Sequence, residues 1–310
     1  MRSDLLHVVT CISNPVRYQS RWRLYERFAA EMERAGVHLV TVELAYGDRP
    51  FAVTSAGNPR HIQVRSRSEL WSKENLLNIG VSHLPADWRY LAWIDADVQF
   101  QNPGWAAETV ERLQLFSVLQ LFSHAHDLDP EHQVLDCRKP KTGFMYAYWE
   151  GLPASKQYDD GNWHPGYAWA IRREAYEALG GFMDFCILGS ADRHMAMALV
   201  GKAELSINRD LSESYKKRVL AWQERAERHV RRNVHYVPGL ITHWWHGKKR
   251  DRRYVERWQI LRRWKYDPEL DLLRNWSQHG LLELTDRSCG LRDDIRRYLR
   301  ARNEDSIDVA

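Results

Sequence analysis

Two aspartates separated by one residue, Asp95 and Asp97, directly follow the short apolar run 90–94. An apolar run of this length, bounded by polar residues, is typical of a buried strand, although periodicity alone also allows a helix. Open α/β sheets bind ligands at the carboxyl ends of their strands, where these two carboxylates would stand. Carboxylate oxygens suit hard cations such as Mg²⁺ or Mn²⁺, which commonly bridge to substrate phosphates. The alternative interpretation is a surface loop with two solvated aspartates.

A second candidate for metal chemistry is the segment 243–249, His-Trp-Trp-His-Gly-Lys-Lys. Neutral imidazole binds divalent transition metals, so His243 and His246 are candidate ligands, and Lys248 could meet phosphates. Structural or solvated histidines are the alternative.

Candidate groups for an acceptor lie between these two segments. Asp192 would begin a helix, where capping is the ordinary role of an aspartate, but a carboxylate aimed into a cleft also suits a general base for a hydroxyl nucleophile. The segment 163–169 places aromatic rings around a Pro-Gly turn, which normally lies at the surface. This segment is either an acceptor-binding lip or packing, and its candidate residues are Trp163, His164, Tyr167 and Trp169.

Candidate donor-binding residues occur earlier in the chain. The first apolar run ends at Asn14-Pro15, and the end of the first strand of a nucleotide-binding α/β fold holds a base or ribose. Basic and amide side chains ahead of the aspartate pair, Arg65, Lys73 and Asn75, are candidates to hold ribose or phosphates, with Trp71 beside them. A plain turn and a solvated helix start are the alternatives.

The elements that would position these residues alternate between strand and helix, which indicates a mostly parallel sheet covered on both faces. Residues 124–161 are polar, and we expect a long surface loop there. From Tyr254 onward we expect helices rich in arginine. The patterns predict strands near 7–12, 37–43, 62–64, 90–94, 117–122, 167–171 and 235–242, and helices near 22–35, 73–81, 106–115, 173–179, 192–200 and 211–232.

Composition limits the classes of protein that need to be considered. The chain has 310 residues and 44% hydrophobic residues, values of a globular protein with a real core. Its four cysteines are widely separated, which indicates reduced thiols. No segment approaches the ~18 consecutive apolar residues of a membrane span, and we expect a cytoplasmic protein. The 14 tryptophans suit the stacking of sugars or bases, and nine Lys and Arg residues stand against two acidic ones in 248–265.

Taken together, these motifs resemble those of the nucleotide-sugar glycosyltransferases of the GT-A fold, over roughly residues 7–253. The likeness is greatest to the family-2-like group and to the galactosyl- and polypeptide N-acetylgalactosaminyl-transferases. It implies an α/β fold with a Rossmann-like nucleotide-binding mixed sheet flanked by helices. The expected GT-A domain is 1–250, with a nucleotide-sugar half (1–122) and an acceptor half (123–250), and a basic helical extension follows at 251–310.

The resemblance also implies roles for individual residues. Asp97 would bind the metal, Asp95 would help to hold the ribose or sugar, and His246 or His243 would complete the metal site. Asp192 would be the base or acceptor anchor of an inverting reaction. The family commonly has Glu-Asp at this point, whereas this chain has Ala191 before the aspartate, which leaves inversion or retention open.

The predicted function is therefore a glycosyltransferase dependent on Mn²⁺ or Mg²⁺, moving a hexosyl or pentosyl group from a nucleotide-diphosphate sugar to a hydroxyl. A saccharide or glycoconjugate acceptor is the family default. The basic run and the tryptophans also motivate a hydroxymethylated pyrimidine in phage DNA, reached by base extrusion in a phage-infected host. The rival predictions are a non-catalytic sugar- or nucleic-acid-binding protein and a nucleotidyltransferase, although the glycine-rich phosphate loop of the latter is missing. The sequence leaves the oligomeric state open.

Overall fold

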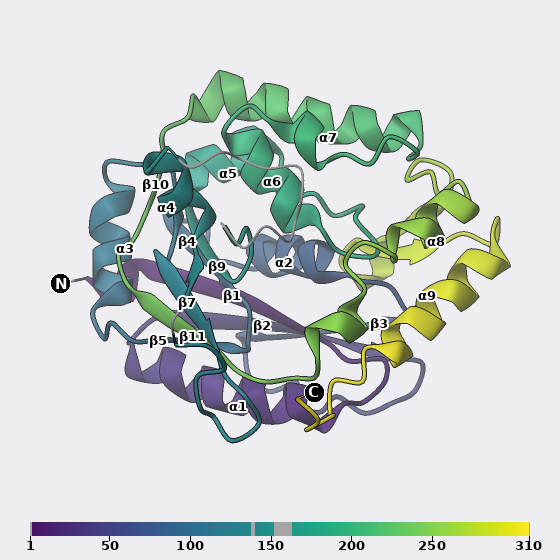
Figure 1. Ribbon diagram of the computed structural model, residues 1–310, viewed down its shortest axis with the longest axis horizontal. Coiled ribbons are helices and arrows are strands. Elements are labelled where there is room, and N and C mark those ends of the chain that lie inside the picture. Colours follow the sequence, from purple (N-terminus) through teal and green to yellow (C-terminus); the bar gives the residue numbers. More distant parts are fainter. Residues whose placement is uncertain (1, 138–139, 152–162, 310) are drawn as a thin grey trace.

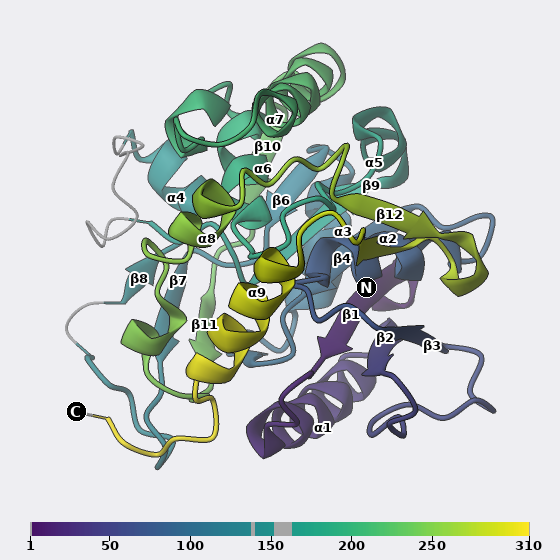
Figure 2. The ribbon, with the colours of Figure 1, turned by 90° about the vertical axis from the view of Figure 1, so that its right-hand side faces the viewer.

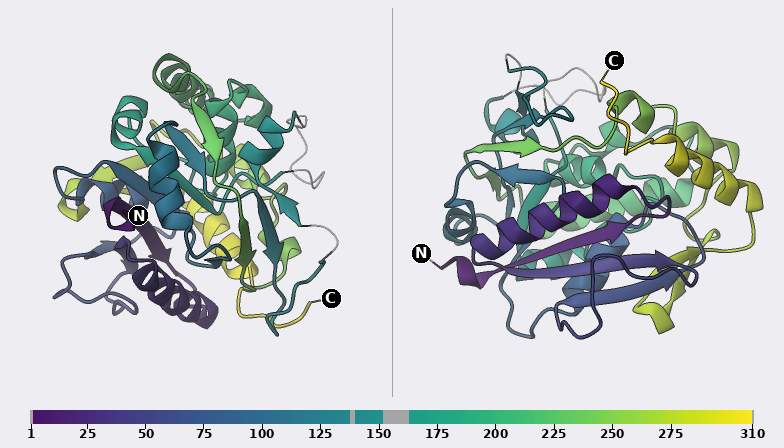
Figure 3. Two further views of the ribbon diagram at one scale, coloured as in Figure 1. Left: turned by 90° about the vertical axis from the view of Figure 1, so that its left-hand side faces the viewer. Right: turned by 90° about the horizontal axis from the view of Figure 1, so that it is seen from below.

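A seven-stranded sheet runs through the middle of the molecule, with helices on both of its faces (Figures 1 and 3). The computed structural model describes residues 2–137, 140–151 and 163–309. In spatial order the strands are β10 (Val234–Tyr236), β6 (Val118–Gln120), β9 (Ala168–Arg172), β4 (Tyr90–Ile94), β1 (Leu6–Ser13), β2 (His38–Tyr46) and β3 (His61–Ser66).

Most neighbouring strands in this sheet are parallel. Strand β1 is parallel to both β2 and β4, whereas β9 is antiparallel to β4 and β6. The predicted α/β class with a mostly parallel sheet is therefore confirmed. Because the carboxyl ends of β1 and β4 meet at one edge, the residues that follow these two strands share that edge.

Each face of the sheet is buried under its own set of helices. Along β1, Val8 belongs to one apolar cluster and the next residue, Val9, to the other, as alternation in a strand requires. On the first face lie α1 (Gln19–Arg34) and α3 (Trp105–Leu113). On the second lie α2 (Lys73–Ser82), α4 (Phe144–Trp149), α5 (Arg173–Leu179), α6 (Ala191–Leu199) and α7 (Glu213–Arg225), which continues into a π-helical turn, Ala226–Val230.

A second, four-stranded sheet extends the first face. Its order is β5 (Val98–Phe100), β11 (Leu240–His243), β7 (His124–Asp127) and β8 (Lys141–Thr142). The prediction of a surface loop over 124–161 is wrong for the part that forms β7, β8 and α4, while 152–161 lies outside the described residues. Strand β7 has the sequence His-Ala-His-Asp, which carries no apolar pattern, so its conformation depends on pairing with the distant β11.

The C-terminal part contains a hairpin as well as helices. Helices α8 (Trp258–Arg263) and α9 (Cys289–Ala301) flank β12 (Leu272–Asn275) and β13 (Leu281–Leu284), so the prediction of helices alone is wrong for this pair. The amide of Asn75 in α2 holds the hairpin, accepting from Leu282 N at 2.8 Å and donating to Gly280 O at 3.3 Å. Figure 2 shows α9 running across the molecule in front of the central sheet.

The predicted extension 251–310 belongs to the main body of the protein. Its side chains Leu261, Ile295 and Leu299 are part of the larger apolar cluster, together with residues of β1 and α2. All four cysteines are free thiols, in line with the prediction. Among the described residues, no helix combines the length and the apolar character that a membrane span requires.

Candidate active site

The two aspartates that follow β4 have different partners. The backbone N–H of Asp95 donates to Tyr167 O at 2.8 Å, and Trp244 N donates to Asp97 O at 2.8 Å. These bonds fasten the turn after β4 to the segments that precede β9 and follow β11. The Asp95 carboxylate pairs with the ammonium group of Lys73 at the start of α2. The Asp97 carboxylate meets His243, the last residue of β11, and His246, in the loop that follows it.

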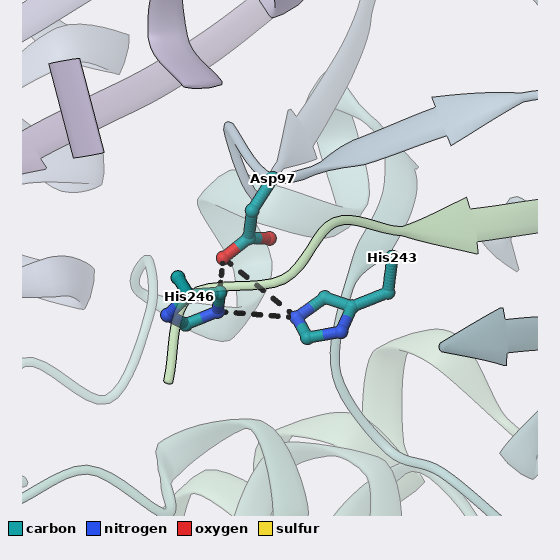
Figure 4. A group of neighbouring side chains, drawn as sticks. All are labelled: Asp97, His243 and His246. Atoms are coloured by element: carbon teal, nitrogen blue, oxygen red, sulfur yellow. Dashed lines mark hydrogen bonds and ion pairs between the residues drawn. The ribbon is translucent and has the colours of Figure 1, made fainter. Parts of the chain in front are cut away.

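Asp97, His243 and His246 converge on one point (Figure 4). The Nε2 atom of His246 lies 2.9 Å from Asp97 Oδ2 and 3.2 Å from His243 Nε2, and His243 Nε2 lies 3.9 Å from Asp97 Oδ2. Adjacent ligands of an octahedral ion with bonds near 2.1 Å lie about 3.0 Å apart. Two of the three spacings match this geometry, and two imidazoles with one carboxylate are a donor set for a divalent transition metal.

A carboxylate behind His243 sets the orientation of that ring. Nδ1 of His243 lies 3.0 Å from Oδ1 of Asp127, at the end of β7. A proton on Nδ1 donates to the carboxylate and leaves the Nε2 lone pair directed at the convergence point, as in the carboxylate–histidine pairs of metal sites. Burial would raise the pKa of Asp127, but His243 and the ammonium groups of Lys141 and Lys249 lower it, so this group stays a carboxylate.

The protonation states of the other two groups also fit a cation. Burial and the neighbouring Arg252 lower the pKa of His246 to about 4, so its ring is neutral at pH 7. Burial opposes ionisation of Asp97, but His246, His243 and Arg252 outweigh it and lower the pKa. Among the described residues, the Oδ1 atom of Asp97 and the Nδ1 atom of His246 are buried without a hydrogen-bond partner. Deprotonated donors with an unsatisfied oxygen are what a divalent metal requires, so these residues fit one.

A second charged group lies next to the metal ligands, around Lys73. Burial would lower the pKa of this ammonium, but Asp95, Glu74 and Asp192 outweigh it and raise the pKa, so Lys73 stays charged. Burial raises the pKa of Glu74 to about 8, even though Lys73 opposes the shift. Asp192 lies in the first turn of α6, where its Oδ1 accepts from the backbone N–H of Arg193 at 2.8 Å.

One cavity, of about 170 Å³, connects these groups. Its walls come from the end of β1, the start of α2, the turn after β4, the segments before β9 and α6, the loop after β11, and the C-terminal segment. The sequence-predicted residues that line it are Asn14, Pro15, Lys73, Asp95, Asp97, His164, Tyr167, Asp192, His243 and His246, together with Trp71.

The predicted acceptor residues divide into two pairs. His164 and Tyr167 line the cavity with their rings stacked, 3.8 Å between centroids and 10° apart in plane. Trp163 and Trp169 lie outside its lining: both are buried in the larger apolar cluster, and Trp169 stacks on Trp93 of β4. The structure therefore brings only His164 and Tyr167 to the metal ligands.

Three of the predicted donor residues are outside the cavity lining. The guanidinium group of Arg65 donates to the carbonyls of Gly47 and Arg49. Asn75 holds the β12–β13 hairpin, as described above. Lys248 is buried in the loop 244–248, which follows β11, carries His246 and is called the histidine loop below, and it pairs with Asp308. Asn14 does line the cavity, although its side-chain amide closes a turn with the backbone of Tyr18.

Several residues that line the cavity or support its ligands were not predicted from the sequence. Glu74 stands next to Lys73 in the chain, and a buried carboxyl at the start of α2 could have been suspected from that position. Asp127, which orients His243, lies within the segment that was expected to be a loop. The arginines and the carboxylate of the C-terminal part have no local signal, because their role depends on where the chain returns: Arg252, Arg257, Arg302 and Glu304.

Neither a protein-family model nor a curated protein matches this sequence. Among solved structures, a mutant of Drosophila β1,4-galactosyltransferase 7 in complex with manganese, UDP-Gal and xylobiose matches at a TM-score of 0.35 and 12% identity, over 66% of this chain and 63% of that one. The catalytic domain of the same enzyme with xylobiose matches at 0.31 and 13%, over 66% and 62%. TarS of S. aureus, residues 1–349, matches at 0.35 and 10%, over 73% and 72%. Because these scores and identities are low, the functional assignment rests on the geometry of the site.

Proposed function

We propose that the protein is a metal-dependent glycosyltransferase that uses a nucleotide-diphosphate sugar. The observation that carries this proposal is the meeting of Asp97, His243 and His246, with Asp127 behind His243, in a cavity at the carboxyl ends of β1 and β4. This edge of an α/β sheet is where nucleotides bind. A divalent ion bound there supplies positive charge to the diphosphate of the donor.

The nature of the ligands favours Mn²⁺ over Mg²⁺. Mg²⁺ takes oxygen ligands almost exclusively, whereas two of the three groups here are imidazoles. Asp95 is held by Lys73 at the other side of the turn, and in the proposal it accepts hydrogen bonds from the ribose or sugar hydroxyls. Asn14 and Pro15, at the end of β1, line the part of the cavity assigned to the base or ribose.

Asp192 is the candidate base for the acceptor hydroxyl. Its Oδ2 lies beside Gly166, so the carboxylate is next to the stacked rings of His164 and Tyr167. In an inverting transfer, the acceptor oxygen forms a bond to the anomeric carbon as the bond from that carbon to the phosphate oxygen breaks. The proton of the hydroxyl passes to Asp192, and the nucleoside diphosphate leaves with the bonding electron pair.

For the acceptor we favour a saccharide hydroxyl, with either a hexosyl or a pentosyl group transferred. The stacked rings of His164 and Tyr167 offer an apolar face of the kind that sugars bind. The basic run 248–265 was a reason to consider a modified DNA base as the acceptor. Five of its cations pair with acidic side chains, Lys248, Lys249, Arg250, Arg262 and Arg263, and two more, Arg252 and Arg257, are buried in the cavity wall.

The test is the loss of metal-dependent chemistry in Asp97→Ala. We expect Mn²⁺ affinity to fall by at least about a hundredfold and Mn²⁺-dependent release of nucleoside diphosphate from sugar nucleotides to cease, because the variant lacks the anionic ligand. Mn²⁺ binding is measured by titration calorimetry. Turnover is measured as the release of nucleoside diphosphate from UDP-, GDP- and TDP-sugars. The control is Asp87→Ala, an exposed residue before the opposite end of β4. Full activity of Asp97→Ala in the presence of EDTA would refute the mechanism. If the wild type binds a sugar nucleotide without turnover, the protein is a binding scaffold.

A further inference from the structure

Arginines from both ends of the chain line one wall of the active-site cavity. Arg21 comes from α1, Arg252 and Arg257 from the segment that precedes α8, and Arg302 follows α9. The exposed fractions of Arg252, Arg257 and Arg302 are only 8%, 6% and 4%. Arginine is almost never buried to this extent without a compensating anion. Because water does not solvate these buried guanidinium groups, an anion is expected to compensate their charge.

Two tyrosines gather these side chains into one cluster. The Tyr298 hydroxyl accepts from Arg302 Nη1 at 3.2 Å and from Arg257 Nη1 at 3.4 Å, and it donates to the carbonyl of Arg252 at 3.0 Å. The Tyr254 hydroxyl accepts from Arg252 Nη1 at 3.2 Å, and Arg257 lies over the Tyr254 ring. The guanidinium groups of Arg252 and Arg257 are thus held in place by neutral tyrosines.

The acidic groups around this cluster do not balance its charge. Glu304 pairs with Arg21 and with Arg302. Within the described ranges, neither Arg252 nor Arg257 has an ion pair with a carboxylate, and the Nε atom of each is buried without a hydrogen-bond partner. Burial should raise the pKa of Tyr298, yet Arg302 and Arg257 lower it, which reports the local positive potential. The cluster has the charge and the donors of an anion site.

The position of the cluster indicates which anion it would hold. Nη2 of Arg252 lies 2.9 Å from Nε2 of His246, so the cluster adjoins the metal ligands directly. Nη2 of Arg257 donates to Ser190 Oγ at 2.6 Å, next to the start of α6 and two residues before Asp192. An anion here would lie against both the metal and the reacting end of the cavity.

We propose that Arg252, Arg257 and Arg302 bind the diphosphate of the donor, so that the C-terminal segment completes the donor site. This inference rests on the proposed glycosyltransferase function. When the bond from the sugar to the phosphate oxygen breaks, the electron pair stays on the diphosphate, and the guanidinium groups neutralise the charge that develops there. The step needs no oxidant or further reactant. The arginines then take the role that the sequence had assigned to Lys248.

The test uses inorganic pyrophosphate as the probe, with EDTA present so that the metal does not contribute. Titration calorimetry on the full-length protein compares the wild type with Arg257→Lys and Arg302→Lys, which keep the charge but lose the planar pair of donors. We expect the wild type to bind and each variant to bind at least about tenfold more weakly. Arg297→Gln, an exposed arginine on α9, is the matched control and should bind within twofold of the wild type. Melting curves confirm that each scored variant is folded.

Two results would overturn the inference: no pyrophosphate binding by the wild type in EDTA, or variants that bind as tightly as Arg297→Gln. If one lysine variant fails to fold, the other carries the comparison with Arg297→Gln. Turnover with Mn²⁺ separates this inference from the proposed function. Arginine-dependent pyrophosphate binding without cleavage of any sugar nucleotide would leave the anion site standing and remove the function. Cleavage of a sugar nucleotide by Arg257→Lys with unchanged kcat and KM would leave the proposed function standing and remove the anion site.

Discussion

Two aspartates one residue apart have separate tasks because the turn that carries them is fastened on both sides. The bond to Tyr167 O holds Asp95 near Lys73, and the bond from Trp244 N holds Asp97 near the histidines. The Asp95 carboxylate thus joins an ion pair with an ammonium group, while Asp97 retains a buried oxygen without a hydrogen-bond partner in the part of the chain that the structure describes. The same residue type has two electrostatic environments within a few ångströms, which suits one carboxylate to metal binding and the other to hydrogen bonds.

Glu74 is the residue whose ionisation should be visible in the stability of the protein. Its pKa is about 8 in the folded chain, against 4.5 for an unperturbed glutamate. Between these pH values the unfolded state releases a proton that the folded state keeps. The stability contributed by neutral Glu74 is therefore complete below pH 4.5 and is lost as the pH rises toward 8.

We expect Glu74→Gln to remove this loss of stability at rising pH, because glutamine does not ionise. One titrating group changes the free energy of unfolding by at most about 1.36 kcal/mol per pH unit. In the wild type, Glu74 should therefore lower the free energy of unfolding by about 3 kcal/mol between pH 4.5 and 7. Urea denaturation of both proteins across this range measures the difference. Glu131→Gln, at an exposed position, is the control and should keep the slope of the wild type. An equal slope in Glu74→Gln would contradict the assignment of a buried neutral carboxyl.

At the scale of elements, the loop after β11 and the chain that follows α9 depend on each other. The Nε1 atom of Trp245 donates to Ser306 O at 2.5 Å, and Lys248 pairs with Asp308. At the other side of this tail, the Asp305 carboxylate accepts from the backbone N–H groups of Gln19 and Ser20 at 2.9 and 2.7 Å, at the start of α1. The tail therefore ties the histidine loop to the N-terminal half of the molecule.

Gly247→Ala should loosen this connection. Gly247 has φ +83°, and a Cβ there would lie 2.7 Å from Asn303 O and 3.0 Å from Glu304 Cα. Strained backbone and a clash with main-chain atoms should destabilise the protein by about 1–3 kcal/mol and displace residues 303–308. Denaturant unfolding measures the first effect, and hydrogen exchange of the tail measures the second.

The matched control is Gly57→Ala, because a Cβ at Gly57 meets no atom within 4 Å. We expect it to stay within about 0.5 kcal/mol of the wild type. If Gly247→Ala were as stable as this control and the exchange of its tail unchanged, the tail would not be packed on the histidine loop in solution.

At the scale of the whole molecule, the cavity exists because segments that are distant in the sequence meet at one edge of the sheet. The turn after β4 supplies the two aspartates, the end of β11 and the loop after it supply one imidazole each, and the C-terminal part supplies arginines. The same folding disperses the basic run of 248–265. Five of its cations pair with acidic side chains, and two more are buried in the cavity wall.

We therefore expect weak binding to duplex DNA. Each phosphate that is neutralised adds about −0.9 to the slope of log K against log salt concentration. With few exposed cations in register, the slope should be no steeper than about −2, measured by fluorescence anisotropy between 50 and 200 mM NaCl. Duplexes with and without hydroxymethylcytosine should behave alike. A slope near −5, or a clear preference for the modified duplex, would restore DNA as the acceptor.

Local sequence patterns were sufficient for much of the fold and for part of the site. Strands β1 and β4 and helices α1 and α2 follow from apolar periodicity and turn residues, because a buried face imposes its period on the chain. Asp97 and the two histidines could be suspected because metal ligands are few in kind and here stand beside recognisable strands. Strand β7 and the β12–β13 hairpin could not be predicted in this way, since pairing partners and packing, and not local periodicity, determine them.

The sequence by itself determined which residues can hold a metal and which strands carry them. Only the tertiary structure decided which of the other candidates lie near them. Tyr167 and Trp169 are two residues apart, yet one lines the cavity and the other packs in the core. The physical reason is that α9 and the β12–β13 hairpin are buried against the sheet. This burial brings together four residues that are distant in the sequence, Arg21, Asp97, Arg257 and Arg302. Burial is a property of the whole chain, and no local pattern records it.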